Sequence, residues 1–204
     1  IGRTYIFYND GSIPTTAATA DVIITGETAS SSFGIALTSG DWNADGKIDL
    51  AVGAYGYSSN RGRIYMYTFN DGVVTGEATS NNFGYAMTSG DFNADGKTDL
   101  AVGAYGYSSN AGRTYIFYND GSIPTTAATS DVIITGEAIS FFGSALTSGD
   151  FNADGKTDLA VGAYGYSTNT GRAYIFITEA KAEEALMQFQ SIGYVNVIGN
   201  LEVR

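Results

Sequence analysis

The feature that most constrains this chain is a stretch of 18 residues that occurs three times. GDWNADGKIDLAVGAYGY at 40–57 returns as GDFNADGKTDLAVGAYGY at 90–107 and again at 149–166. The copies begin 50 and 59 residues apart, so the chain repeats a unit of 50–60 residues. Chains of this kind stack one small unit several times, and each unit contacts only its neighbours.

Each repeat contains four candidate strands. In the first full repeat we place them at 33–42, 48–57, 62–69 and 73–77. An Asn-Asp-Gly sequence between the third and fourth strands predicts a tight turn. The 15 Tyr and 11 Phe residues also favour strands. Four short antiparallel strands per unit are typical of a β-propeller blade, so we predict an all-β chain built from such blades.

The repeats fill residues 1–177 with about three and a quarter blades, or 13 strands. Because a single propeller ring needs at least about four blades, this segment is predicted to be an incomplete ring. Residues 178–204 share no repeat motif. Their apolar spacing predicts a short helix at 179–192, and 194–198 and 201–204 read as a strand pair. Two explanations remain open: an arc of a longer chain, or a unit that completes itself by self-association.

An acidic loop precedes the second strand of every repeat. In the first copy, Asp41, Asn43, Asp45 and Asp49 occupy positions 1, 3, 5 and 9, and Gly46 occupies position 6. Alternating oxygen donors around a glycine are how a chain wraps Ca²⁺, and the position-7 carbonyl is a further donor. Mg²⁺ fits less well because it demands stricter geometry. The loop is no EF-hand, since Val stands at position 12 and helices do not flank it.

A simpler interpretation is an Asx-rich turn with solvated acids. Three copies in one register favour the metal, and crowded carboxylates without a cation would raise one another's pKa. We therefore predict about three Ca²⁺ ions, one in each loop. The predicted ligands are Asp41, Asn43, Asp45, Lys47 (carbonyl) and Asp49; Asp91, Asn93, Asp95, Lys97 (carbonyl) and Asp99; and Asp150, Asn152, Asp154, Lys156 (carbonyl) and Asp158.

Charge and composition exclude several function classes. A net charge of −11 with no basic stripe argues against nucleic acid and against an anionic membrane surface as partners. No apolar run reaches the length of about 18 residues that a membrane span requires, so we expect no membrane insertion. The chain has no His and no Cys, which removes the commonest general base and thiolate chemistry. We predict that the protein is not an enzyme.

Tyr57, Tyr107 and Tyr166 recur beside short polar segments. Aromatic rings next to polar groups suit sugar stacking, so we take these tyrosines as candidate ligand-binding residues. The competing interpretation places them in the core between blades. Three arginines and three glutamates also recur at fixed positions, and we expect the arginines to contact acids or carbonyls of a neighbouring blade; these residues are Arg63, Arg113 and Arg172, with Glu27, Glu77 and Glu137.

The combined motif resembles a known family. Phe33-Gly34, followed by Asp41-x-Asn43-x-Asp45-Gly46-x-x-Asp49 and Leu-Ala-Val-Gly-Ala, is similar to the FG-GAP repeat of integrin α-subunit β-propellers and their microbial relatives. The resemblance covers about 1–177. Tyr55, Tyr105 and Tyr164 stand where the family name has Pro.

The resemblance implies a seven-bladed propeller with Ca²⁺ in the acidic loops. It also implies adhesion or ligand recognition outside the cell or at its surface, and a fungal lectin with this repeat binds sugars between blades. We therefore predict a calcium-stabilised extracellular module whose partner is a protein or a glycan, with carbohydrate as one ligand class. The alternative is a structural subunit that completes a ring or filament by self-assembly or beside neighbouring blades of a longer chain.

Overall fold

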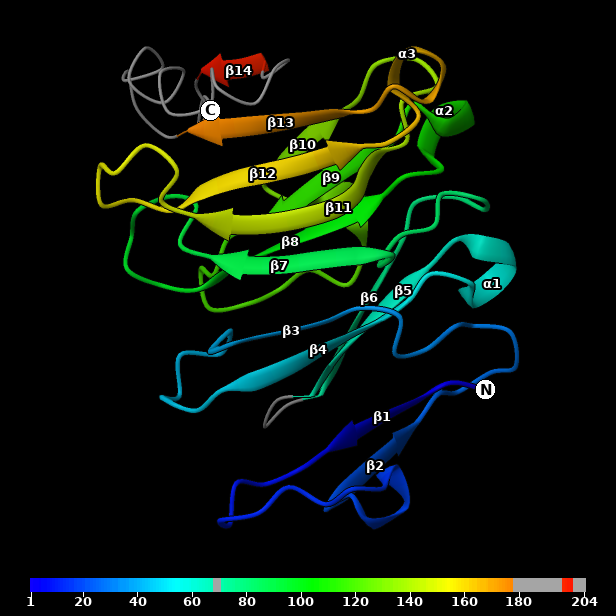
Figure 1. Cartoon of the computed structure of the whole chain (residues 1–204), viewed down its shortest axis with the longest axis vertical. Helices are drawn as coiled ribbons and strands as arrows, with labels where there is room; N and C mark the ends of the chain where they lie inside the picture. Colours follow the sequence, from blue (N-terminus) through cyan, green and yellow to red (C-terminus); the bar gives the residue numbers. More distant parts are fainter. Residues whose placement is uncertain (68–70, 178–195, 200–204) are drawn as a thin grey trace.

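The computed structural model describes residues 1–67, 71–177 and 196–199, and within these ranges it is an all-β protein. Its strands form one two-stranded and three four-stranded sheets, which follow one another along the chain (Figure 1). The N-terminal sheet contains β1 (Arg3–Ile6) and β2 (Val22–Thr25). The first sheet contains β3 (Leu37–Gly40), β4 (Asp49–Ala54), β5 (Arg63–Tyr67) and β6 (Gly72–Thr75). The second contains β7 (Ala86–Gly90), β8 (Asp99–Ala104), β9 (Arg113–Phe117) and β10 (Val132–Thr135). The third contains β11 (Phe142–Gly149), β12 (Asp158–Ala163), β13 (Arg172–Ile177) and β14 (Asn196–Gly199).

The predicted second strand is too long at its C-terminal end in every repeat. β4 ends at Ala54, and Tyr57–Asn60 forms a four-residue helical turn, α1. Ser58 and Ser59 have φ values of 50° and 58°, which an extended strand does not allow. The same turn recurs as α2 (Tyr107–Asn110) and α3 (Tyr166–Asn169). The alternating apolar pattern thus continues past the point where the backbone leaves the sheet.

The connection between the third and fourth strands varies in length between repeats. Its long form carries a 3₁₀ turn, η1 (Ala17–Thr19) in the N-terminal sheet and η2 (Ala127–Thr129) in the second sheet. Gly11 and Gly121 in the predicted Asn-Asp-Gly turns have φ values of 108° and 104°, in the region that glycine favours.

The third sheet departs from the expected antiparallel pattern. β11, β12 and β13 pair antiparallel, but β14 pairs with β13 in parallel. A strand was expected at 194–198, and β14 lies at Asn196–Gly199. The expected helix at 179–192 and the strand at 201–204 lie outside the described residues. The tail thus supplies a fourth strand to the third sheet, in a different direction from β6 and β10.

Neighbouring sheets approach so closely that only glycine fits at the contact. A Cβ atom on Gly62 would lie 2.0 Å from the Phe83 carbonyl oxygen, and one on Gly53 would lie 2.1 Å from that of Gly84. The second and third sheets repeat this contact through Gly112 and the Phe142 carbonyl oxygen. The Phe-Gly pair of one repeat therefore docks its backbone onto glycines of the preceding repeat.

The apolar core lies within and between these sheets. Phe33 packs edge-to-face on Tyr65, with ring centroids 5.3 Å apart, and Phe142 packs on Tyr174 at the same distance. At the first strands, Thr38 donates a hydrogen bond to Ser89 across 3.1 Å, and Ser148 donates one to the Ser89 carbonyl across 2.7 Å. Polar contacts thus join β3, β7 and β11, and edge-to-face aromatic pairs pack within the repeats.

Candidate functional site

The three acidic loops lie where the sequence places them, between the first and second strands of each four-stranded sheet. In the first loop, the two Asp41 carboxylate oxygens accept hydrogen bonds from the backbone N–H groups of Asp45 (3.1 Å) and Gly46 (2.9 Å). Asn43 Oδ1 accepts from the Asp45 N–H (3.0 Å), and Asp45 Oδ1 accepts from the Lys47 N–H (2.9 Å). Gly46 has a φ of 82°, so the predicted bend is present.

The second and third loops repeat this geometry. Asp91 and Asp150 each accept two backbone hydrogen bonds, from positions 5 and 6 of their own loop. The position-9 acids, Asp49, Asp99 and Asp158, are buried and accept from the N–H of position 2 at 3.0, 2.8 and 2.8 Å. The three loops therefore share one geometry, in which the acids accept hydrogen bonds from the backbone of their own loop.

Two position-9 acids, Asp99 and Asp49, lie in an unfavourable electrostatic environment. Burial raises the pKa of Asp99 to about 6, although N–H groups of Asn119 and Phe92 lower it, and Asp95 and Asp91 raise it further. Burial likewise raises the pKa of Asp49, and Asp45 and Asp41 add to this. A buried carboxylate beside two others favours its neutral form unless a cation compensates the charge.

The donor set can be compared with the needs of a metal. Within the described ranges, no three acidic side chains converge closely enough to hold an ion between them. The donors at positions 1, 3, 5, 7 and 9 are nevertheless all oxygens, which is the ligand type of Ca²⁺. Each accepting oxygen also keeps a second lone pair. The chemistry of the loops fits a hard cation, and the Ca²⁺ assignment stays a prediction.

An arginine guanidinium stacks on the ring of each of the three candidate tyrosines. The guanidinium carbons of Arg63, Arg113 and Arg172 lie 3.7, 3.5 and 3.5 Å from the ring centroids of Tyr57, Tyr107 and Tyr166. This is cation–π geometry, and it covers one face of each ring. The tyrosines are partly buried and lie on α1, α2 and α3. Only the other face of each ring is left for a ligand.

The same arginines join neighbouring sheets. Arg63 pairs with Glu27 of the N-terminal sheet at 3.0 Å, Arg113 with Glu77 at 2.9 Å, and Arg172 with Glu137 at 2.9 Å. Tyr65 and Tyr174 add hydrogen bonds to Glu27 (2.8 Å) and Glu137 (2.6 Å). The expected contact between arginines and acids of a neighbouring repeat is confirmed.

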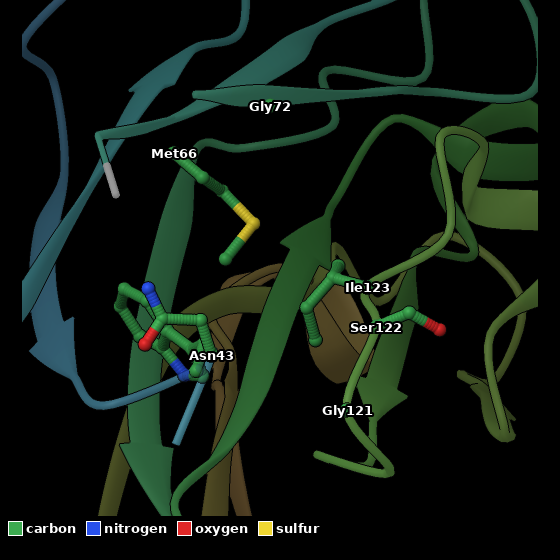
Figure 2. A pocket seen from close by; sticks show the side chains of 7 residues that line it. Asn43, Met66, Gly72, Gly121, Ser122 and Ile123 are labelled. Atoms are coloured by element: carbon green, nitrogen blue, oxygen red, sulfur yellow. The ribbon is translucent and has the colours of Figure 1, made fainter. Parts of the chain in front are cut away.

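Sequence reasoning missed a pocket of about 250 Å³ between the first and second sheets (Figure 2). Met66 and Ile123 point toward one another from opposite sides, and Asn43 lies at its lower edge in the view. Trp42, Gly72, Gly121 and Ser122 complete the lining. Trp42 is 2% exposed, and its indole Nε1 is buried without a hydrogen-bond partner. The signal was present, because Trp42 is the sole tryptophan and Phe92 and Phe151 hold its place elsewhere.

Comparison with known proteins agrees with the repeat. The sequence profile of the FG-GAP repeat matches residues 33–67, 83–117 and 142–176, which make up just over half of the chain. Each match begins at the phenylalanine of a Phe-Gly pair and ends in or beside the third strand of its sheet. No curated protein matches the chain. From the motif, the sheets and these three matches together, the chain belongs to the FG-GAP repeat family.

Proposed function

We propose that the protein is a calcium-stabilised propeller module that recognises a protein or glycan outside the cell. FG-GAP repeats are linked to adhesion and ligand-recognition modules and are typical of extracellular proteins. Among the described residues, no helix has the length and hydropathy needed to cross a bilayer. The observation that carries the proposal is the position of Asn43, which belongs to an acidic loop and also lines the pocket.

Ca²⁺ in the first loop would be held by Asp41, Asn43, Asp45 and Asp49 with the Lys47 carbonyl. The ion supplies positive charge to carboxylates that are buried or crowded. Because Asn43 forms part of the pocket edge, a cation in the loop would also fix that edge. Weak sites suffice outside the cell, since modules there bind Ca²⁺ at about 10⁻⁴–10⁻³ M.

Thermal unfolding with Ca²⁺ and with chelator tests the metal. Each occupied site should add about 1–3 kcal/mol to the free energy of unfolding at saturating Ca²⁺. Isothermal titration should count about three sites, and Mg²⁺ should bind more weakly. The triple variant D45N/D95N/D154N removes one charge per loop and should lose the stabilisation. D120N, at an exposed aspartate outside the loops, is the matched control. An unfolding temperature that ignores Ca²⁺ contradicts the proposal.

We place the ligand in the pocket beside Trp42. Met66 and Ile123 offer apolar contact there, and Asn43 and Ser122 offer polar side chains. The nearby acids and the net charge of −11 disfavour an anion, so a neutral, oxygen-rich ligand fits best. Carbohydrate meets this description. Tyr57, Tyr107 and Tyr166 form a second candidate surface, with one ring face already under arginine.

A glycan array followed by titration of the W42F variant tests this site. Phenylalanine occupies the same position in the other two loops, so W42F should keep the fold while changing the wall of the pocket. We expect affinity to fall about ten-fold, because the smaller ring leaves the pocket wall less complementary to the ligand. An array without binders contradicts carbohydrate recognition. Binding that survives W42F but is lost in Y57A would move the site to the tyrosines.

The remaining assignments follow from the same reasoning. We propose that residues 1–177 form the repeat array, that 178–204 form a C-terminal tail whose β14 joins the third sheet, and that the protein binds rather than catalyses. The alternative function is a structural subunit that associates with further copies of itself.

A further inference from the structure

Two nearly identical segments of this chain lie in different surroundings. Residues 2–27 match 112–137 except that Ala20 is replaced by Ser130. β1 pairs with β2 in the register in which β9 pairs with β10. Yet Tyr5 is 37% exposed, whereas its counterpart Tyr115 is 0% exposed. Arg3 is exposed, and no ion pair of Arg3 is found in the described part of the chain, while Arg113 pairs with Glu77.

The difference arises from one missing neighbour. β9 is flanked by β10 and β8, but β1 has β2 alone, so its second edge is unpaired. The strand that covers β9 reads Asp-Leu-Ala-Val-Gly-Ala, and the same six residues form β12 in the third sheet. The chain therefore contains a strand whose sequence already pairs with the sequence of β1.

Among the described residues, the third sheet lacks the contact that the other sheets make with a following repeat. A Cβ on Gly103 would lie 2.0 Å from the Gly143 carbonyl oxygen, but the nearest atom to one on Gly162 is a side-chain Cβ of its own sheet at 3.2 Å. Gly171 shows the same contrast with Gly112, since its nearest neighbour is 3.6 Å away. Figure 1 places β1 at one end of the series of sheets and β13 and β14 at the other. Within the described residues, β1 thus has an unpaired edge at one end, and the third sheet has glycines without a docked Phe-Gly pair at the other.

We propose that two copies of this chain join head to tail by strand exchange, with β1 of one copy pairing with β12 of the other in place of β13. The register follows from β8 and β9: Ala101 faces Ile116 and Val102 faces Tyr115, so Ala160 faces Ile6 and Val161 faces Tyr5. The incoming Arg3 and Tyr5 take the positions of Arg172 and Tyr174, beside Glu137 and Phe142.

β1 would restore more of the contacts found in the second sheet than β13, the strand it replaces. β1 brings β2 as an antiparallel neighbour, as in the second sheet, whereas β13 has β14 in parallel. β1 also arrives with the next repeat already docked, because a Cβ on Gly2 would lie 1.9 Å from the Phe33 carbonyl oxygen. The Gly34 carbonyl can then lie over Gly162, as Gly143 lies over Gly103. Thr4 is buried against that repeat, and its counterpart Ala173 on β13 is exposed.

Sedimentation of the 204-residue chain over a concentration series tests the exchange. The mean mass should rise above one chain with concentration. Y5K should weaken association about ten-fold or more, because the lysine is tolerated at an exposed position but would be buried in the joined sheet. I23K is the matched control, since Ile23 is 42% exposed and its counterpart Ile133 is 41% exposed. A chain that stays monomeric at every concentration, or one that Y5K leaves unchanged, overturns the proposal.

Disulfide trapping tests the partner strands directly, because the chain has no cysteine of its own. Directly opposed residues in antiparallel strands have Cα atoms about 4.5–5.5 Å apart, within the range of a disulfide. Mixed I6C and A160C chains should form a disulfide-linked pair under mild oxidation. I6C alone forming the pair would indicate a symmetric β1–β1 contact, and no product in the mixture would exclude this register. Either result overturns the exchange and leaves the calcium and ligand proposals untouched.

Discussion

The segments 2–27 and 112–137 form the same strands with the same register, yet only the second becomes core. Ala17 is exposed while Ala127 is 0% exposed, and Asn9 is exposed while Asn119 is 1% exposed. In the second sheet, Asn119 donates its N–H to Asp99 (2.9 Å) and its amide N–H to the Asp41 carbonyl (2.8 Å). The comparison teaches that local sequence sets the strand pairing, whereas neighbouring repeats supply the burial.

The largest expected effect separates Y115A from Y5A in dilute, monomeric protein. Removing the fully buried ring of Tyr115 should cost about 3–5 kcal/mol, because it leaves a cavity beside Phe83. Y5A should cost about 1 kcal/mol or less, since the ring is already 37% exposed. Urea unfolding of both variants measures the difference. Equal costs would mean that burial does not distinguish the two segments.

A second pair tests the glycine contact between repeats. G112A and G171A meet the same backbone strain, because Gly112 and Gly171 have φ values of 81° and 77°. The new Cβ of G112A would lie only 2.1 Å from the Phe142 carbonyl oxygen, whereas the nearest described atom for G171A, the Tyr164 carbonyl oxygen, is 3.6 Å away. We expect G112A to be less stable than G171A by about 1–3 kcal/mol. Thermal unfolding gives the comparison, and a G171A loss as large as that of G112A would show that something else already covers Gly171.

Hydrogen bonds that reach between sheets give the third pair. N119A removes the amide donor to the Asp41 carbonyl and should cost about 1–3 kcal/mol. N9A changes an exposed side chain and should stay within about 0.5 kcal/mol. Denaturant unfolding at equal salt and Ca²⁺ is the measurement. The difference between N119A and N9A should persist in a Y5K background, in which the proposed strand exchange is suppressed.

The smallest effect belongs to the one residue by which the segments differ. Ser130 donates a weak hydrogen bond of 3.4 Å to the Val132 carbonyl. S130A and its reciprocal A20S should each change the free energy of unfolding by less than about 0.5 kcal/mol. A larger change in either variant would assign part of the contrast to sequence rather than to neighbours.

Much of the fold could be predicted because the same pattern of strands and turns occurs three times in the sequence. Strand order, the loop positions, the bend at Gly46 and the contact of Arg63 with a neighbouring repeat all follow from spacing and residue type. The end of β4 could not be predicted, since the alternating pattern runs on into a turn with positive φ at Ser58. The parallel pairing of β14 also lies beyond pattern reasoning, because direction depends on how the chain returns to β13.

The candidate site was predicted only in part. The acidic loops were expected from their residue types, while the pocket depends on tertiary contacts between Trp42 and a loop of another repeat. The Trp in place of Phe distinguishes position 42 in the sequence, but it does not predict the pocket beside the ring. That space arises where Met66 of β5 and Gly72 of β6 face Gly121, Ser122 and Ile123 of the connection before β10, two segments far apart in sequence.

The glycine contacts have a further consequence for how such chains change over generations. Every junction between repeats uses the same backbone atoms, a carbonyl of Phe-Gly against glycines of the preceding unit. A unit gained or lost by unequal recombination therefore recreates a working junction without any compensating mutation. The number of units can therefore vary without changing the junction, whereas each junction glycine is fixed by the carbonyl oxygen that faces it.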